Sequence, residues 1–205
     1  MYHGDAPGTP PFATVFINLT SRVDRRVHIE EQLLRAGLDA TRLEAATGKT
    51  TPERIVARSW DSHLNAIFDT KTVGHPRVAM SPGERGCCMS HLCAWQRIAS
   101  CPDEAMPLLV LEDDSVLADE FVQKLSKSIE AVHAAWREPG SRNTVLYCCA
   151  DVAKWRTHTI AVDADLCIRE TAYQWQTAAC VIQPAVARVG SSCRLHADEP
   201  SRTHS

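Results

Sequence analysis

Residues 108–114 read Leu108-Leu109-Val110-Leu111-Glu112-Asp113-Asp114. Four consecutive apolar residues are typical of a short strand that is buried on both faces, as strands of parallel sheets are. The three carboxylates that follow should then lie at the carboxyl end of this strand. Ligands of open α/β sheets bind at that edge. The segment therefore predicts both an α/β sheet and the position of its site.

Helix signals lie on both sides of this strand. Upstream, Ser81 and Glu84 predict a capping box with Pro82 at the first helical position, and Pro102 marks the end of the helix. Its apolar face is predicted to carry Cys88, Leu92, Trp95 and Ala99. Downstream, a second helix has an apolar stripe at helical spacing, formed by Phe121, Leu125, Ile129, Val132 and Trp136.

The rest of the chain continues this alternation of strands and helices. Strands are predicted over 14–19, 41–46, 145–149 and 178–182, and a hairpin over 159–162 and 166–168. A helix is expected between a capping-box-like start at Ser21 and a C-cap at Gly37, with an apolar face formed by Val27, Ile29, Leu33 and Leu34. Pro184 opens a short last helix, and 47–80 reads as a long loop with one short helix. The pattern predicts an α/β fold with a mostly parallel sheet flanked by helices.

Length and composition limit the number of domains and the kinds of partner. The 205 residues fit a flexible arm over 1–13, a single domain over 14–195 that is short at its C-terminal end, and a tail over 196–205. A net charge of −3 without a basic run argues against a nucleic-acid partner. No apolar stretch is long enough to span a bilayer. Nine cysteines without a C-x-x-C pair, and no visible signal peptide, favour the cytoplasm, whereas a missing native N-terminus would leave the ER lumen open.

The three carboxylates are the strongest functional signal. Like charges gathered at a sheet edge repel each other, and a divalent cation removes this cost. Their hard oxygen atoms suit Mg²⁺ or Mn²⁺. In a strand, Glu112 and Asp114 point to the same side, so they could share the metal while Asp113 is directed elsewhere. The alternative is a solvated acidic cap at the start of the next segment.

A basic turn follows the first predicted strand, where nucleotides often bind. It runs from Asn18 to Arg26, and Arg22, Arg25 and Arg26 could meet phosphates or pair with Asp24. The alternative is a charged helix start that is paired internally.

The start of the upstream helix is the third signal. Gly83 and Gly86 cost helix stability, which suggests the close approach of a ligand or another backbone. Cys87 and His91 share one helical face, so a zinc site is conceivable, although no second ligand pair supports it. His91 could instead bond a substrate group or be a satisfied core histidine.

The motifs, taken in order, resemble glycosyltransferase family 25, the family of lipopolysaccharide and collagen hydroxylysine galactosyltransferases. The resemblance covers roughly residues 14–190. It rests on four segments: Phe16-Ile17-Asn18-Leu19 with Arg22, Asp24 and Arg25; Ala45-Ala46-Thr47-Gly48; Ser81-Pro82-Gly83-Glu84 with Gly86, Cys87, Ser90, His91 and Trp95; and Leu109-Val110-Leu111-Glu112-Asp113-Asp114.

The resemblance implies a GT-A-like, Rossmann-type fold, a UDP-sugar donor, Mn²⁺ and inversion to give a β-linked galactose. The acceptor would be a hydroxyl of a glycan, a lipooligosaccharide or a protein hydroxylysine. Glu112 and Asp114 would hold the metal. Donor-binding residues would be Asn18, Arg22, Asp24, Arg25, Ala46, Gly48, Gly83, Glu84, His91 and Asp113. The family usually continues well past the last strand, whereas this chain ends soon after His196, at Ser205. This leaves open a non-catalytic UDP-sugar-binding remnant or another divalent-metal nucleotide enzyme.

An inverting transfer needs a general base to take the proton of the acceptor hydroxyl. Asp151 follows the predicted strand over 145–149, so it should emerge at the same edge as the carboxylates. The alternative is a turn residue that caps the chain after that strand.

Overall fold

The computed structural model describes residues 9–56, 80–100, 106–136, 145–149, 152–174 and 178–191. Five of the strands in these ranges form one sheet in the order β2-β1-β3-β7-β4. They are β1 (Ala13–Asn18), β2 (Thr41–Glu44), β3 (Leu108–Glu112), β4 (Leu146–Tyr147) and β7 (Ala179–Ile182). The helices are α1 (Val23–Ala36), α2 (Glu53–Val56), α4 (Pro82–Ala99), α5 (Phe121–Trp136) and α6 (Pro184–Ser191).

The sheet is mostly parallel, as predicted. β1 runs parallel to β2 and β3, whereas β7 is antiparallel to both β3 and β4. The carboxyl ends of β1, β2, β3 and β4 therefore meet at one edge of the sheet, and β7 runs the other way.

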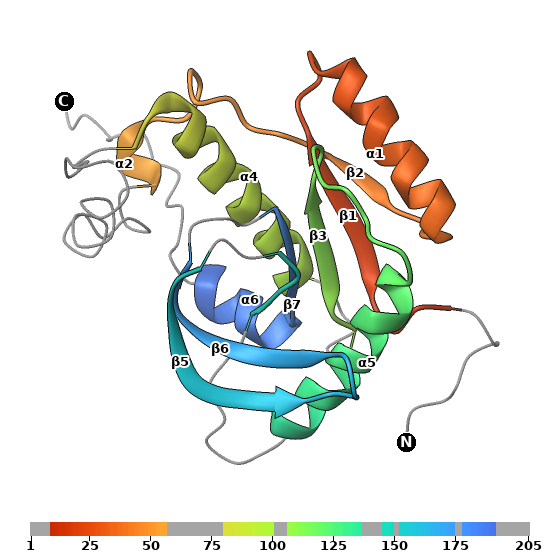
Figure 1. The fold of residues 1–205 in the computed structure, drawn as a ribbon. Helices are drawn as coiled ribbons and strands as arrows, with labels where there is room; N and C mark the ends of the chain where they lie inside the picture. Colours follow the sequence, from red (N-terminus) through yellow and green to blue (C-terminus); the bar gives the residue numbers. More distant parts are fainter. Residues whose placement is uncertain are drawn as a thin grey trace, which may run out of the picture.

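Helices cover both faces of the sheet, and β3 is buried between them (Figure 1). α1 and α5 pack on one face, where Phe16, Leu109 and Leu111 point towards them. α4 and α6 pack on the other face against Val15, Ile17, Val110 and Ile182. Leu109, Val110 and Leu111 have no exposed surface, which confirms the predicted buried strand. This arrangement confirms the predicted α/β fold with a mostly parallel sheet flanked by helices, and it is consistent with a GT-A-like fold.

Two helix predictions need correction. α1 begins without a capping box, because its N-cap is Arg22 and no side chain caps it. Ile29 and Leu33 are buried as predicted, but Val27 and Leu34 are exposed, so the apolar face is narrower than the sequence suggests. At the other end, the left-handed Gly37 caps the helix as predicted, with a φ of 67°.

α4 begins as predicted but is rotated relative to the predicted apolar face. Ser81 and Glu84 form the expected capping box. The buried residues are instead Gly86, Ser90, His91, Ala94 and Ile98, while Cys88, Leu92, Trp95 and Ala99 are only partly buried. Small and polar residues face inwards because the helix lies very close to the segment Ala46–Gly48.

The predicted hairpin forms a separate two-stranded sheet and is longer than expected. It consists of β5 (Val152–Ala161) and β6 (Cys167–Gln174), and Ile168 packs against the core beneath α1 and α5. In the part of the chain that the structure describes, no helix is both long and apolar enough to cross a bilayer.

Candidate active site

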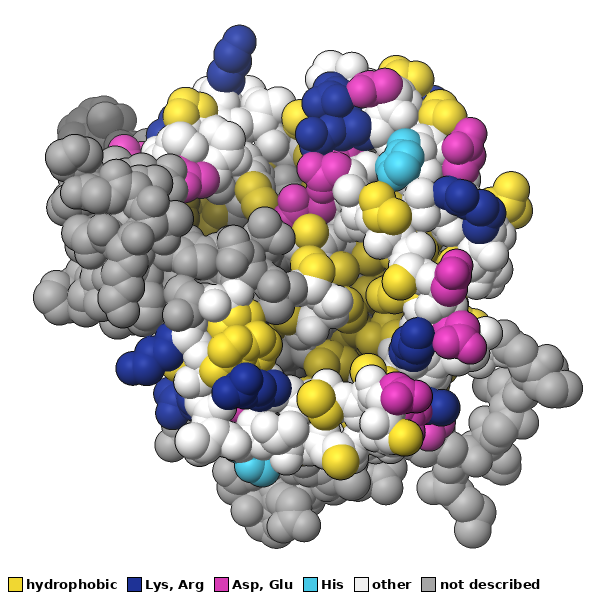
Figure 2. All heavy atoms as spheres, viewed as in Figure 1, with side chains coloured by type: hydrophobic (Ala, Val, Ile, Leu, Met, Phe, Trp, Pro, Cys, Tyr) yellow, Lys and Arg dark blue, Asp and Glu magenta, His cyan; other side chains and the backbone are white. Residues whose placement is uncertain are grey.

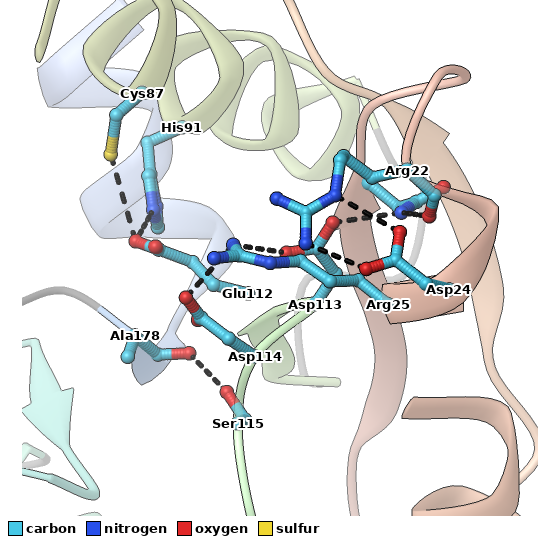
Figure 3. A network of polar contacts seen from close by, with 11 residues as sticks. Arg22, Asp24, Arg25, Cys87, His91, Glu112, Asp113, Asp114, Ser115 and Ala178 are labelled. Carbon is cyan, nitrogen blue, oxygen red and sulfur yellow. Dashed lines mark hydrogen bonds and ion pairs between the residues drawn. The ribbon is translucent and has the colours of Figure 1, made fainter. Parts of the chain in front are cut away.

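The three predicted site segments converge at the carboxyl edge of the sheet. β1 and β3 pair in register, with Ile17 opposite Glu112, so the basic turn after β1 and the carboxylates after β3 lie side by side. α4 crosses next to them and contributes His91 and Cys87 (Figure 3). Figure 2 shows the result at the surface, where acidic and basic side chains meet above a hollow with a hydrophobic floor.

The three carboxylates take three different directions. β3 ends at Glu112, and a turn closed by a 3.1 Å bond from the Ser115 N–H to the Glu112 carbonyl follows at once. The expectation that strand alternation places Glu112 and Asp114 on one side is therefore wrong, because the strand has already ended. Glu112 faces α4, whereas Asp113 and Asp114 face the basic turn (Figure 3).

Asp113 is buried and fully engaged. Its two oxygens accept bonds from the Asn18 amide at 2.7 Å and from Arg25 at 3.2 Å. Asn18 is 1% exposed and is itself held by Arg42, whose Nε lies 3.0 Å from the Asn18 Oδ1. Burial of a carboxylate is tolerated when such partners compensate for lost water. Asp113 thus ties the basic turn to β3.

The charged residues of the basic turn pair with nearby carboxylates, as the alternative of a charged helix start predicted. Arg22 forms two bonds to Asp24, at 3.0 and 2.7 Å, and these bonds lower the pKa of Asp24 to about 2. The same pairing raises the pKa of Arg22. Arg25 bridges Asp113 and Asp114, with 2.9 Å to the Asp114 oxygen. Arg22, Asp24, Arg25 and Asp114 all keep substantial exposed surface, so a ligand could still reach them.

The segment Ala46–Gly48 packs against the start of α4 rather than standing apart. The Ala46 N–H donates to the Ser90 hydroxyl at 2.9 Å. A β-carbon on Gly86 would lie 2.7 Å from the Ala46 carbonyl oxygen, and one on Gly48 would overlap the Pro82 carbonyl. The close approach expected at Gly86 is therefore to another backbone. Gly83, in contrast, faces open space.

His91 is buried and bonded to Glu112. Its Nε2 lies 3.0 Å from the Glu112 Oε1, and the Cys87 Sγ lies 3.6 Å from the same oxygen. Glu84 contributes its carboxylate to the capping box, at 2.7 Å from the Ser81 N–H. The ring of His91 thus holds a site carboxylate, and Glu84 holds the start of α4.

Asp151 lies outside the described residues. β4 nevertheless runs parallel to β3, since both are antiparallel to β7, so the strand before Asp151 does end at the carboxylate edge.

Sequence reasoning missed Arg42 and the thiol of Cys149. Arg42 on β2 holds Asn18 and also lies 3.1 Å from the Thr20 hydroxyl. Cys149 follows β4, and burial first, then the nearby Glu112 among other groups, raises its pKa. Arg42 could not be found from the sequence, because its role depends on β2 lying beside β1 in the sheet.

This fold and edge define a class of proteins, the GT-A-like α/β domains with carboxylates at the end of a central strand. The sequence profile of glycosyltransferase family 25 (LPS biosynthesis protein) matches residues 12–189. The chain belongs to this family.

Two similar proteins share about 30% of their residues with this chain over the matched region, and both are much longer than it. The chain is 30% identical over 121 residues to a procollagen lysyl hydroxylase and glycosyltransferase of Acanthamoeba polyphaga mimivirus, covering 54% of this chain and 13% of that protein. It is 28% identical over 130 residues to procollagen galactosyltransferase 2 of Mus musculus, covering 63% of this chain and 20% of that protein. The match thus spans a fifth or less of either relative.

Proposed function

We propose that this chain is a glycosyltransferase that moves galactose from UDP-galactose to a hydroxyl acceptor, with inversion and with the help of Mn²⁺. The observation that carries the proposal is the convergence of Glu112, Asp113 and Asp114 with the basic turn at the carboxyl edge of the sheet. The family and the name of the mouse relative support the reaction and the sugar.

The basic turn has the chemistry that a nucleotide diphosphate needs. Arg22 and Arg25 keep about 42% and 39% of their side chains exposed while staying fixed by carboxylates. Guanidinium groups that are held in place lose less freedom when they bind phosphate oxygens. A UDP-sugar would therefore lie across this turn, with its diphosphate towards the carboxylates.

The carboxylates fit a hard divalent cation. Glu112 and Asp114 offer oxygen atoms and remain 28% and 49% exposed, whereas Asp113 is committed to Asn18 and Arg25. Glu112 faces His91 and Asp114 faces Arg25, so one of the two side chains would have to turn towards the other for both to hold Mn²⁺, while Asp113 fixes the turn between them. When bound, such a cation neutralises the charge that develops on the leaving diphosphate.

Asp151 is the proposed general base. β4, the strand that precedes it in the sequence, ends at the same edge as β3 and is a different strand from the one that carries the proposed metal-binding residues. The Asp151→Asn variant should lose transfer to an acceptor while keeping its affinity for UDP and Mn²⁺, and its pH–rate profile should lose the acidic limb. Unchanged transfer by this variant would remove Asp151 from the mechanism.

Donor release and acceptor transfer test the function directly. The chain would be incubated with UDP-galactose and UDP-glucose, with and without Mn²⁺, against hydroxylysine peptides and lipooligosaccharide acceptors. We expect Mn²⁺-dependent transfer that prefers UDP-galactose. Saturable UDP binding without any transfer would favour a donor-binding protein instead, and turnover of nucleoside triphosphates would favour another nucleotide enzyme.

The variant Asp114→Ala should abolish transfer and Mn²⁺ dependence. Its free energy of unfolding should change by no more than about 0.5 kcal/mol, because Asp114 is half-exposed and Arg25 keeps Asp113 as a partner. Asp163→Ala is the matched control and should keep full activity, because it removes an exposed carboxylate in the turn between β5 and β6 that pairs with Lys127 of α5. Activity of Asp114→Ala within about twofold of the unmodified chain would sink the metal assignment.

A further inference from the structure

Three different metal-binding groups meet where α4 crosses the end of β3. The Cys87 Sγ, the His91 Nε2 and a carboxylate oxygen of Glu112 all lie within 4.8 Å of one another (Figure 3). Cys87 and His91 are four residues apart, so one face of α4 presents both to Glu112. The three groups are therefore already close enough to bind one ion with only small side-chain movements.

The spacing of the donor atoms suits a tetrahedral zinc ion. Ordinary Zn–S, Zn–N and Zn–O lengths put the sulfur about 3.6 Å and the nitrogen about 3.4 Å from the oxygen in a tetrahedral shell. The observed separations are 3.6 Å from the Cys87 Sγ and 3.0 Å from the His91 Nε2 to the Glu112 Oε1. A shift of a few tenths of an ångström in the histidine ring would therefore admit the ion.

The groups are held in place before any metal binds. His91 is 8% exposed, and α4 is pinned to the segment Ala46–Gly48 by the close packing at Gly86 and the Ser90 hydroxyl bond. Glu112 is the last residue of the central strand β3, and its N–H donates to the Ala178 carbonyl at 2.7 Å. Because the backbone under each ligand is fixed, metal binding would cost little ordering of the chain.

The chemistry of the three groups separates this site from that of Mn²⁺. A thiolate and an imidazole select zinc over magnesium and manganese, which prefer oxygen atoms alone. We infer that Cys87, His91 and Glu112 form a zinc-binding site that shares Glu112 with the oxygen-only metal site at Asp114. Among the described residues three protein ligands come together, which leaves one position of a tetrahedral zinc ion to a further ligand or to water.

Because both metals would use Glu112, zinc should affect the sugar transfer; this part of the inference rests on the proposed function. Zinc bound to Cys87 and His91 takes Glu112 away from Mn²⁺, so zinc should inhibit a Mn²⁺-dependent transfer. The chain would thus respond to two metals in opposite directions through one carboxylate.

Zinc binding is tested on the full chain under reducing conditions, by competition with a chromogenic chelator. Co²⁺ serves as a second probe, because a cobalt–thiolate bond gives a charge-transfer absorption. Cys87→Ser should weaken zinc binding at least about tenfold, since even the loss of an outer-shell partner costs that much, and should abolish the charge-transfer band. The control is Cys93→Ser, an exposed cysteine on the same helix, which should leave both unchanged.

Equal zinc affinity in Cys87→Ser and the unmodified chain would overturn the inference. His91→Ala should show the same loss as Cys87→Ser, but His91 is buried, so the exposed Cys87 carries the decision. Zinc binding without any sugar transfer would leave this site standing and remove only the proposed function. Transfer without zinc binding at Cys87 would do the reverse.

Discussion

Asn18 connects the residues of the charged network through three side-chain hydrogen bonds. Its amide donates to Asp113 at 2.7 Å and to the Arg22 carbonyl at 3.0 Å, and its oxygen accepts from Arg42. A neutral side chain is required here, because an aspartate would face Asp113 with a second negative charge. By fixing Asp113, Asn18 also sets where Arg25 lies and hence which partner Asp114 has.

Replacing Asn18 with alanine should destabilise the fold by about 2–4 kcal/mol. The change leaves the buried Asp113 and the Arg42 guanidinium each without one partner, and bonds to charged groups are the costly ones to lose. Urea unfolding measures the loss. Thr20→Ala, which removes an exposed hydroxyl between Arg42 and Glu44, should cost well under half as much. Equal losses in the two variants would show that Asn18 has no special role.

The variant Arg22→Ala should separate binding from stability. Its partner Asp24 is exposed, and exposed pairs contribute little, so the melting temperature should move by no more than about 2 °C. Affinity for UDP, measured by calorimetry, should fall about tenfold if Arg22 meets the diphosphate. A fall in melting temperature with unchanged UDP affinity would instead make Arg22 a structural residue.

The same ion pair gives a pH signature at the acid end. The pKa of Asp24 is lowered to about 2 by its bonds to Arg22, whereas an unfolded aspartate titrates near 3.8. The pair therefore contributes fully above about pH 4, and its contribution is lost as the pH falls through 2. NMR titration of the Asp24 carboxyl should show the low midpoint, and Arg22→Ala should return it to the ordinary value.

At the scale of the elements, α4 shows which features of a helix the sequence can predict and which it cannot. Its capping residues Ser81 and Glu84 made its start predictable from the sequence, because a local hydrogen-bonding pattern specifies it. The face it buries was not predictable, because Gly86 and Ser90 face inwards only where the loop at Ala46 and Gly48 approaches. That approach is a tertiary contact between distant parts of the chain.

Two glycines of α4 should respond in opposite directions to alanine. Gly86→Ala places a methyl group 2.7 Å from the Ala46 carbonyl oxygen and 2.9 Å from the Gly48 nitrogen, both backbone atoms that cannot easily move. Overpacking of this kind costs about 1–3 kcal/mol, more than the helix propensity of alanine returns. Gly83→Ala meets nothing closer than 3.9 Å and should stabilise by up to about 1 kcal/mol. Urea unfolding that gave the same sign for both variants would contradict the packing at Gly86.

At the scale of the whole molecule, the sequence predicted where the site lies better than how it is built. The apolar run before Glu112 and the strand ending at Asn18 sufficed to place two charged segments on one edge, because parallel strands share their carboxyl ends. The partners within the site were not predictable. Whether Glu112 faces Asp114 or His91 depends on where β3 ends and where α4 crosses, and neither follows from local propensity.

Two thiols lie on β7 and directly after β4, and the one on β7 is buried. Tyr147 on β4 pairs with Cys180 on β7, and Cys148 follows directly. Burial raises the pKa of the Cys180 thiol to about 12 and raises that of Cys148 further from its ordinary value of 9.0. These thiols should therefore stay protonated in the folded chain and resist alkylation, whereas a reagent can reach the exposed Cys167.

Stability should consequently fall in mild alkali. An unfolded cysteine loses its proton near pH 9, while Cys180 in the folded chain keeps it until about pH 12. Unfolding therefore releases protons in this window, so the contribution of the buried thiol is complete below pH 9 and is lost as the pH rises towards 12. Between about pH 8 and 10, the Cys180 thiol should lower the free energy of unfolding by roughly 1 kcal/mol, and Cys148 should act in the same direction. Urea unfolding at the two pH values measures the fall, and Cys180→Ala should reduce it. Cys167→Ala, at an exposed thiol, should leave the pH dependence unchanged, and an equal slope in both variants would place the alkaline transition elsewhere in the chain.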